Sequence, residues 1–114
     1  MSYDVSIGDR HLNYTSNVSA LFYDHIPKKD SSGGLHELHG KTGKQAADII
    51  SGAWARIELA MMSMWELEDV GESEFCAQYD SPNGWGSTVG GMIFLAQIMS
   101  ACIANPRKKV SVSA

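Results

Sequence analysis

The stretch His36-Glu37-Leu38-His39 places two imidazoles and a carboxylate close together, and these are typical ligands of a metal ion. Its histidines are one residue closer than in the His-Glu-x-x-His zinc motif, so they do not share one helix face a full turn apart. Cys76 and Cys102 each lack a second cysteine nearby. The sequence therefore predicts no metal site, and it indicates no cofactor.

A second stretch, Gly40-Lys41-Thr42, is similar to the end of a phosphate-binding loop. That loop has four residues between its first glycine and the Gly-Lys-Thr group, whereas five separate Gly34 from Gly40 here. What remains is Lys41 and Lys44 beside a predicted helix start, where backbone amides attract an anion. The alternative is an ordinary capped helix start with solvated lysines.

Two polar and aromatic clusters lie at predicted turns. Asn13, Tyr14, Thr15 and Asn17, followed by Tyr23, crowd donors and acceptors into a corner between a strand and a helix. Local turn bonds are the simpler explanation of that corner. The other cluster is Asn83-Gly84-Trp85-Gly86, where the tryptophan either caps the core or offers its face to a base or ring.

Support for catalysis is weak. Asp24 and His25 are adjacent on a predicted helix, so their side chains point in different directions and each needs a partner of its own. No serine or cysteine stands in a nucleophile motif. The sequence thus favours binding over an enzymatic activity, and a small enzyme stays open as an alternative.

Composition narrows the class of protein. The 114 residues are 44% hydrophobic and fit a single domain over residues 1–114. A net charge of -4 argues against general nucleic-acid binding, and the apolar runs are too short to span a membrane. No lysine or arginine lies between Ile57 and Pro106, and the acidic segment 66–80 falls within that interval. Because the acidic and basic residues are separated along the chain, an acidic protein would still be able to bind an anion on its basic face.

The elements that position these residues follow from periodicity. Alternation predicts strands at 3–7 and 11–14, and a helix capped by Asn17 or Ser19 that ends before Pro27. Thr42 is expected to cap a long helix whose buried stripe consists of Ala46, Ile49, Ile50, Ala53, Trp54, Ile57, Ala60, Met61, Met64 and Trp65.

Ser73 is expected to cap a short helix that carries Phe75, and Ser87 to begin a last long helix. The buried face of that last helix is predicted to consist of Val89, Met92, Ile93, Ala96, Met99 and Ile103. Residues 109–112 alternate and would pair with the first strand. The predicted fold is α+β, with two long amphipathic helices packed on a small antiparallel sheet formed by the N- and C-terminal strands.

Four motifs occur in order along almost the whole chain. They are Tyr3-Asp4-Val5-Ser6-Ile7, Asn13-Tyr14-Thr15-Ser16-Asn17-Val18, Gly40-Lys41-Thr42-Gly43 and Asn83-Gly84-Trp85-Gly86. In these motifs the chain resembles a family of small uncharacterised bacteriophage and prophage proteins. The resemblance implies a phage accessory protein in the cytoplasm of an infected bacterial host, and it implies no assigned activity.

Two functions follow as hypotheses. In the first, a homo-oligomer sequesters a small nucleotide-like anionic ligand without turnover, as an anti-defence protein would. Its expected binding residues are Asn13, Tyr14, Thr15, Asn17, Tyr23, Lys41, Thr42, Lys44, Asn83, Gly84 and Trp85. Amides at the starts of the two long helices would bind phosphates, and Trp85 or Tyr23 would stack on the base. In the second, the acidic segment 66–80 docks on a host or phage enzyme and inhibits it.

Overall fold

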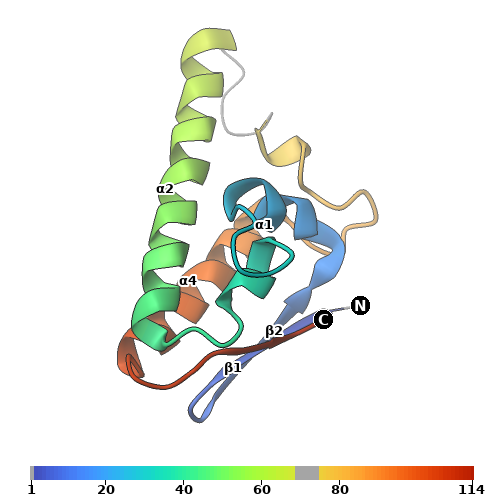
Figure 1. Ribbon diagram of the computed structural model, residues 1–114. Helices are drawn as coiled ribbons and strands as arrows, with labels where there is room; N and C mark the ends of the chain where they lie inside the picture. Colours follow the sequence, from blue (N-terminus) through green and yellow to red (C-terminus); the bar gives the residue numbers. More distant parts are fainter. Residues whose placement is uncertain (1, 69–74) are drawn as a thin grey trace.

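The computed structural model describes residues 2–68 and 75–114, except for the side chains of 64–68. The elements are β1 (Ser2–Ile7), β2 (Arg10–Thr15), η1 (Ser16–Val18), α1 (Ser19–His25), η2 (Gly34–Leu38), α2 (Gly43–Glu68), α4 (Thr88–Ala104) and β3 (Ser111–Ser113), where η denotes a 3-10 helix. Figure 1 shows α2 and α4 packed together, with α1 and the sheet beside them. The predicted α+β fold is confirmed. No helix within the described ranges is long and apolar enough to cross a membrane.

The sheet is antiparallel, with the strand order β2-β1-β3. Asp4 pairs with Asn13 on one side and with Ser113 on the other, which confirms that the N- and C-terminal strands pair. Tyr3, Val5 and Ile7 point into the core, whereas Asp4 is exposed, as the alternation predicts. The two ends of the chain therefore lie together at one end of the sheet (Figure 1).

Helix α2 begins with a reciprocal cap. Thr42 Oγ1 accepts from the Gln45 amide at 3.3 Å, and Gln45 Oε1 accepts from the Thr42 amide at 3.0 Å. The predicted stripe is buried at Ala46, Ile50, Ala53 and Ile57, and Ile49, Trp54, Ala60 and Met61 pack against it. The side chains of Met64 and Trp65, which the prediction included, lie outside the described part.

Helix α4 buries the face opposite to the predicted one. Gly91, Phe94, Leu95, Ile98, Ala101 and Cys102 face the core. Of the predicted core residues, Val89, Ile93 and Ile103 are 49%, 53% and 64% exposed and Ala96 is exposed, whereas Met92 and Met99 are half-buried and pack against the core. The prediction was wrong because α4 is apolar all round and carries no charged residue, so its periodicity does not distinguish the two faces.

The start of α1 also differs from the prediction. Neither Asn17 nor Ser19 caps it; Thr15 caps the preceding η1, and Val18 makes no side-chain cap for α1. The hydroxyl of Ser19 instead accepts from Tyr3 Oη at 2.9 Å. Ser73, the predicted cap of a short helix, lies outside the described residues, and residues 75–77 beyond it are helical.

Candidate functional site

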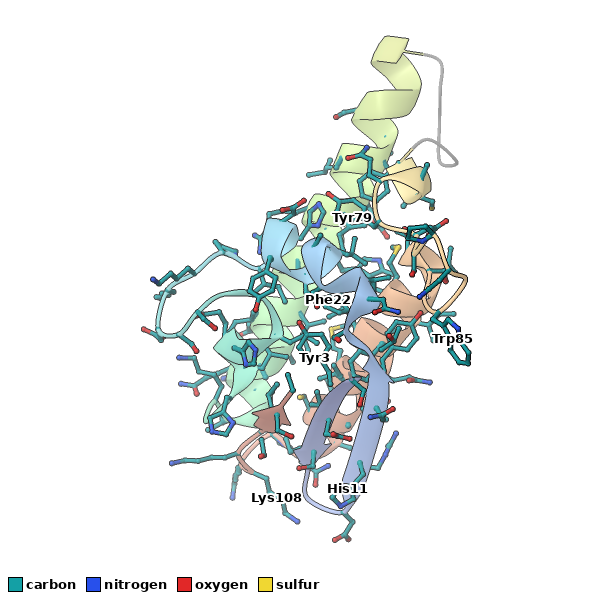
Figure 2. The ribbon with its side chains drawn as sticks, turned by 90° about the vertical axis from the view of Figure 1, so that its right-hand side faces the viewer. Tyr3, His11, Phe22, Tyr79, Trp85 and Lys108 are labelled. Carbon is teal, nitrogen blue, oxygen red and sulfur yellow. The ribbon has the colours of Figure 1, made fainter. Side chains whose placement is uncertain are left out.

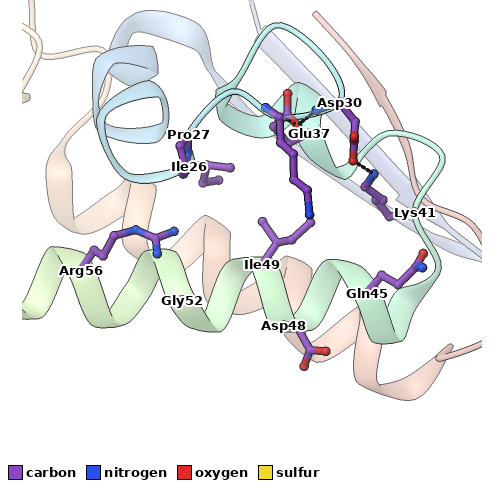
Figure 3. Close-up of a pocket in the computed structure, with 11 residues that line it drawn as sticks. Ile26, Pro27, Asp30, Glu37, Lys41, Gln45, Asp48, Ile49, Gly52 and Arg56 are labelled. Atoms are coloured by element: carbon purple, nitrogen blue, oxygen red, sulfur yellow. Dashed lines mark hydrogen bonds and ion pairs between the residues drawn. The ribbon is translucent and has the colours of Figure 1, made fainter.

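A pocket of about 500 Å³ opens between the segment 26–41 and one face of α2 (Figure 3). This volume lies in the range of small-molecule sites, roughly 300–1,000 Å³. The lining residues are Ile26, Pro27, Lys29, Asp30, Glu37, Lys41, Gln45, Asp48, Ile49, Gly52 and Arg56. We take this pocket as the candidate functional site.

Glu37 holds one wall of the pocket in shape. Its Oε1 accepts from the amides of Lys29 and Asp30 at 3.2 and 2.7 Å, and its Oε2 from those of Ser31 and Gly33 at 2.8 and 2.9 Å. Burial acts to raise the pKa of Glu37, but these four bonds outweigh it and hold the pKa below its usual 4.5. The carboxylate is buried and ionised, and it fixes the loop around itself.

An ion pair joins that loop to the start of α2. Lys41 Nζ binds Asp30 Oδ2, and this hydrogen bond lowers the pKa of Asp30 (Figure 3). Both groups line the pocket, so the pair closes one end of it. Because the side chain of Asp30 is exposed, the pair adds little to stability.

Arg56 brings a cation to the other end of the pocket. Its Nε donates to the backbone oxygen of His25 at 2.9 Å, which fixes the guanidinium plane. The two terminal nitrogens lie over Gly52, 3.4 and 3.6 Å from where a Cβ would stand. Within the described ranges these nitrogens have no hydrogen-bond partner, so they remain available to a ligand.

The remaining surface of the pocket is partly apolar. Ile26, Pro27 and Ile49 line it together with Lys29, whose ammonium group has no partner within residues 2–68 and 75–114. Asp48, an exposed carboxylate on α2, lines it as well, with its side chain on the side of the helix away from Glu37 and Lys41 (Figure 3). The pocket therefore suits a molecule with an apolar body and an anionic group near one of its cations, Lys29, Lys41 or Arg56.

Of the predicted site residues, only Lys41 lines this pocket. Thr42 is the cap of α2, and Lys44 is exposed on its first turn. The amides of that turn are already bonded: Gly43 N donates to Lys108 O at 2.8 Å, and Lys44 N to Pro106 O at 3.1 Å. The expectation that these amides bind a phosphate is therefore wrong.

The start of α4 is closed to an anion in the same way. Thr88 N donates to Asp80 Oδ1 at 2.6 Å, and Gly90 N donates to Ser87 Oγ at 2.9 Å. Helix-terminal amides attract an anion only while they lack partners.

The two polar corners, by contrast, meet each other. Asn17 Nδ2 donates to the backbone oxygen of Trp85 at 3.0 Å, and Ser87 N donates to Tyr14 Oη at 3.1 Å. Thr15 lies against Gly86, where a Cβ would stand 2.6 Å from its methyl group. The Trp85 side chain is 73% exposed and points away from the body (Figure 2). It does not cap the core.

Asn13 and Asn83 serve local structure. Asn13 Nδ2 donates to Ser2 Oγ, Tyr3 O and Asp4 Oδ1 across the sheet. Asn83 Oδ1 accepts from Trp85 N at 2.9 Å, next to Gly84, whose φ is +79°.

Tyr23 stands apart from both corners, because its ring packs on Gly33 and Gly34. The predicted residues thus divide among four places: the pocket end of α2, the Trp85 corner, the sheet around Asn13 and the Tyr23 contact. Trp85 and Tyr23 do not line the pocket. Figure 1 places the loop around Trp85 on the opposite side of the molecule from the first turns of α2.

The histidines hold structural positions. His39 Nδ1 accepts from Val112 N at 3.0 Å, and the buried His25 donates through Nδ1 to Leu21 O at 2.7 Å. Asp24 accepts from Tyr79 Oη at 2.8 Å, so Asp24 and His25 do not pair. The described residues contain no group of three or more metal-ligating side chains that could hold an ion.

Sequence reasoning missed most of the pocket. Gln45, Asp48, Ile49, Gly52 and Arg56 recur at three- and four-residue steps, so they share one face of α2, and this mixed face was the available signal. The loop at 29–37 lines the pocket because the Glu37 side chain folds back on the backbone amides of that loop, and no local sequence pattern predicts this contact. The acidic segment of the second hypothesis falls largely on residues 69–74 and on the side chains of 66 and 68, outside the described part.

No family model matches the chain, and neither a curated protein nor a solved structure is significantly similar to it.

Proposed function

We propose that this protein binds a small anionic ligand in the pocket between segment 26–41 and α2, and holds it without chemical turnover. The observation that carries the proposal is the presence of three cationic side chains, Lys29, Lys41 and Arg56, around one cavity of about 500 Å³. Two of the facing carboxylates are engaged, Glu37 by four amides and Asp30 by Lys41. These contacts occupy the carboxylate oxygens without removing their charges, so Lys29 and the terminal nitrogens of Arg56, which have no partner within the described residues, are the cationic groups that would attract an anion.

The same engagement supports binding over catalysis. A general base needs a free lone pair within reach of the substrate, and a general acid needs a proton to give. Glu37 uses both oxygens for backbone amides, and its lowered pKa leaves it ionised at neutral pH. Asp30, also with a lowered pKa, is paired with Lys41, which leaves Asp48 as the lining carboxylate without a hydrogen bond within the described residues.

We propose a nucleotide-like anion as the ligand class, and a homo-oligomer as the binding form. The biological setting that we propose is a phage accessory protein that sequesters a host signal in the infected bacterial cytoplasm. The sequence motifs described above support that setting. The pocket supports the anionic part of the ligand, and an aromatic stack from Trp85 or Tyr23 is not part of this proposal.

The test removes one pocket charge and compares it with a neighbouring charge outside the pocket. Lys29→Gln removes a lining cation that has no structural bond through its side chain, and Lys28→Gln is the matched control, since Lys28 is exposed and does not line the pocket. AMP and inorganic phosphate serve as probes in isothermal titration calorimetry. We expect Lys29→Gln to weaken AMP binding about tenfold, as for one charge-assisted contact, and Lys28→Gln to leave it nearly unchanged.

Two results would overturn the proposal. One is that neither probe binds and that native mass spectrometry of the purified protein finds no small mass released on denaturation. The other is that both lysine variants weaken binding equally, which would indicate a diffuse surface attraction. If the protein bound AMP but not inorganic phosphate, the phosphate group alone would not account for binding.

A further inference from the structure

The outward face of α4 is uncharged and mostly apolar along its whole length. Val89, Ile93 and Ile103 are 49%, 53% and 64% exposed, Ala96 is exposed, and Met92 and Met99 are half-buried. The polar residues among them, Gln97 and Ser100, are uncharged. An uncharged apolar face of this size on a helix is normally covered.

The neighbouring helix shows what a solvent face of this protein looks like. The exposed positions of α2 include the charged residues Lys44, Asp48, Arg56 and Glu58 beside the apolar Leu59 and Met62. Helix α4, by contrast, has no charged residue in 17 positions. Depletion of charge with retention of aliphatic and methionine side chains is the composition of an interface core.

The spacing of the residues on this face suits packing against the same face of a second copy of the protein. Val89, Ile93, Ala96, Ser100 and Ile103 follow one another at alternating steps of four and three residues, the spacing of a helix–helix seam. If two copies of α4 cross antiparallel at Ala96, Val89 meets Ile103 of the second copy. The small side chain of Ala96 at the crossing lets the two helices approach closely.

Absence of charge meets a requirement of this occupant. In a two-fold interface each patch meets its own copy, so a charged residue near the axis would face an identical charge. This face has none. We propose that the protein forms a two-fold dimer through the outward face of α4, with Ala96 at the axis.

The proposal specifies the oligomer of the proposed function, but it stands on a different surface. None of the residues that line the ligand pocket belongs to α4. The helix is about 25 Å long, so this contact alone makes an interface below the standard size, and the dimer dissociates on dilution.

Sedimentation velocity over a range of concentrations tests the dimer. We expect wild type to approach twice the 12.4 kDa chain mass, and Ile93→Glu to raise the dimer dissociation constant at least about 100-fold. Ala55→Glu, at an exposed position of α2, is the matched control and stays dimeric. Thermal unfolding shows whether Ile93→Glu keeps its fold, as expected for a half-exposed position.

A crosslink tests the register without a disruptive charge. Ala96→Cys places two thiols at the axis, within reach of a disulfide, and a covalent dimer forms on mild oxidation. Val89→Cys is the control, because its two copies would lie about 21 Å apart in this register. Wild type, with its own Cys76 and Cys102, gives the background.

A monomer at all concentrations, or a dimer that survives Ile93→Glu, overturns the proposal. Crosslinking of Val89→Cys as efficient as that of Ala96→Cys would contradict the antiparallel crossing. None of these outcomes changes AMP binding through Lys29, so failure of the dimer and failure of the ligand site can be told apart.

Discussion

The side-chain amide of Asn17 donates to the backbone oxygen of Trp85 at 3.0 Å, across 68 positions of sequence. This bond ties the corner between β2 and α1 to the loop that precedes α4. The Asn83 side chain holds the same loop from within, through Trp85 N. Trp85 is therefore fixed by its backbone, while its ring stays in solvent.

Trp85→Ala is expected to change the free energy of unfolding by less than about 0.5 kcal/mol, because the ring is 73% exposed and both bonds use backbone atoms. Asn17→Ala is expected to cost about 1 kcal/mol, the value of one hydrogen bond. Urea unfolding measures both. A cost above about 2 kcal/mol for Trp85→Ala would show that the ring packs on the protein.

Glu37→Gln is expected to destabilise the protein by about 2–3 kcal/mol. The neutral Gln side chain has one acceptor oxygen for the four backbone N–H groups that now donate to the two carboxylate oxygens. The folded-state pKa of Glu37 is lowered, so its contribution is complete above pH 4.5 and is lost as the pH falls through the lower folded value. Unfolding free energies between pH 7 and pH 3 measure this.

The control for that experiment is Glu58→Gln, at an exposed carboxylate that accepts from Trp54 Nε1 at 2.6 Å. We expect a cost below about 1 kcal/mol there. If Glu37→Gln keeps the acid dependence of wild type, another group is responsible for it.

Tyr79 is expected to lose its phenolic proton at a higher pH than an ordinary tyrosine. Burial first, and then the hydrogen bond to Asp24, raise the pKa of Tyr79 to about 12. Because the folded pKa lies above the unfolded value of 10, the phenol stabilises the fold below pH 10, and this contribution is lost as the pH rises toward 12. Tyrosinate absorbance of wild type minus Tyr79→Phe isolates the transition, and Asp24→Asn should lower its pKa. An unshifted pKa near 10 would contradict the Asp24 contact.

Gly43→Ala should be among the most damaging single-methyl changes. A Cβ there would lie 2.2 Å from Asn105 O and 2.5 Å from Cys102 O, both backbone atoms that cannot move aside alone. We expect a loss of about 2–3 kcal/mol by thermal unfolding. At Gly52, where the nearest atom is Arg56 Nη1 at 3.4 Å, the same change should stabilise the helix by up to about 1 kcal/mol. Equal effects would contradict the close approach of α2 to the end of α4.

Asp48→Asn should strengthen binding of AMP. Asp48 is the lining carboxylate to which the structure gives no hydrogen bond within the described residues, and its charge opposes that of the ligand. Removing it should lower the dissociation constant two- to fivefold, about 0.4–1 kcal/mol. Calorimetry at two salt concentrations checks this, because the gain should shrink as salt screens the charge. Weaker binding would indicate that Asp48 accepts a bond from the ligand.

The elements of this fold were predictable where one face of each is polar. β1 alternates between buried and exposed positions, and the stripe of α2 is bordered by charged residues, so both were placed correctly. Helix α4 lacks that contrast. Its two faces hold similar residues, and only the space between α2 and β2 selects Phe94, Leu95 and Ile98 for the core.

The site was less predictable than the fold. Lys41 was identified because it lies next to a capped helix start, and it does line the pocket. Arg56 was not, because its role depends on a guanidinium that lies over Gly52 and is anchored on His25 O, a contact across 31 positions of sequence. The sequence does not reveal that the amides at the start of α2 are bonded, because their partners, such as Lys108 O, are distant in sequence.

The pairing of Asp4 with Ser113 has a mechanical consequence. The two ends of the chain leave the sheet at the same end of the β1–β3 ladder (Figure 1). A force that pulls the ends apart acts along the hydrogen bonds of that ladder and loads them one pair at a time, since these bonds run perpendicular to the strands. Stretched by its ends, the protein unzips from β3 inward at low force rather than resisting in shear.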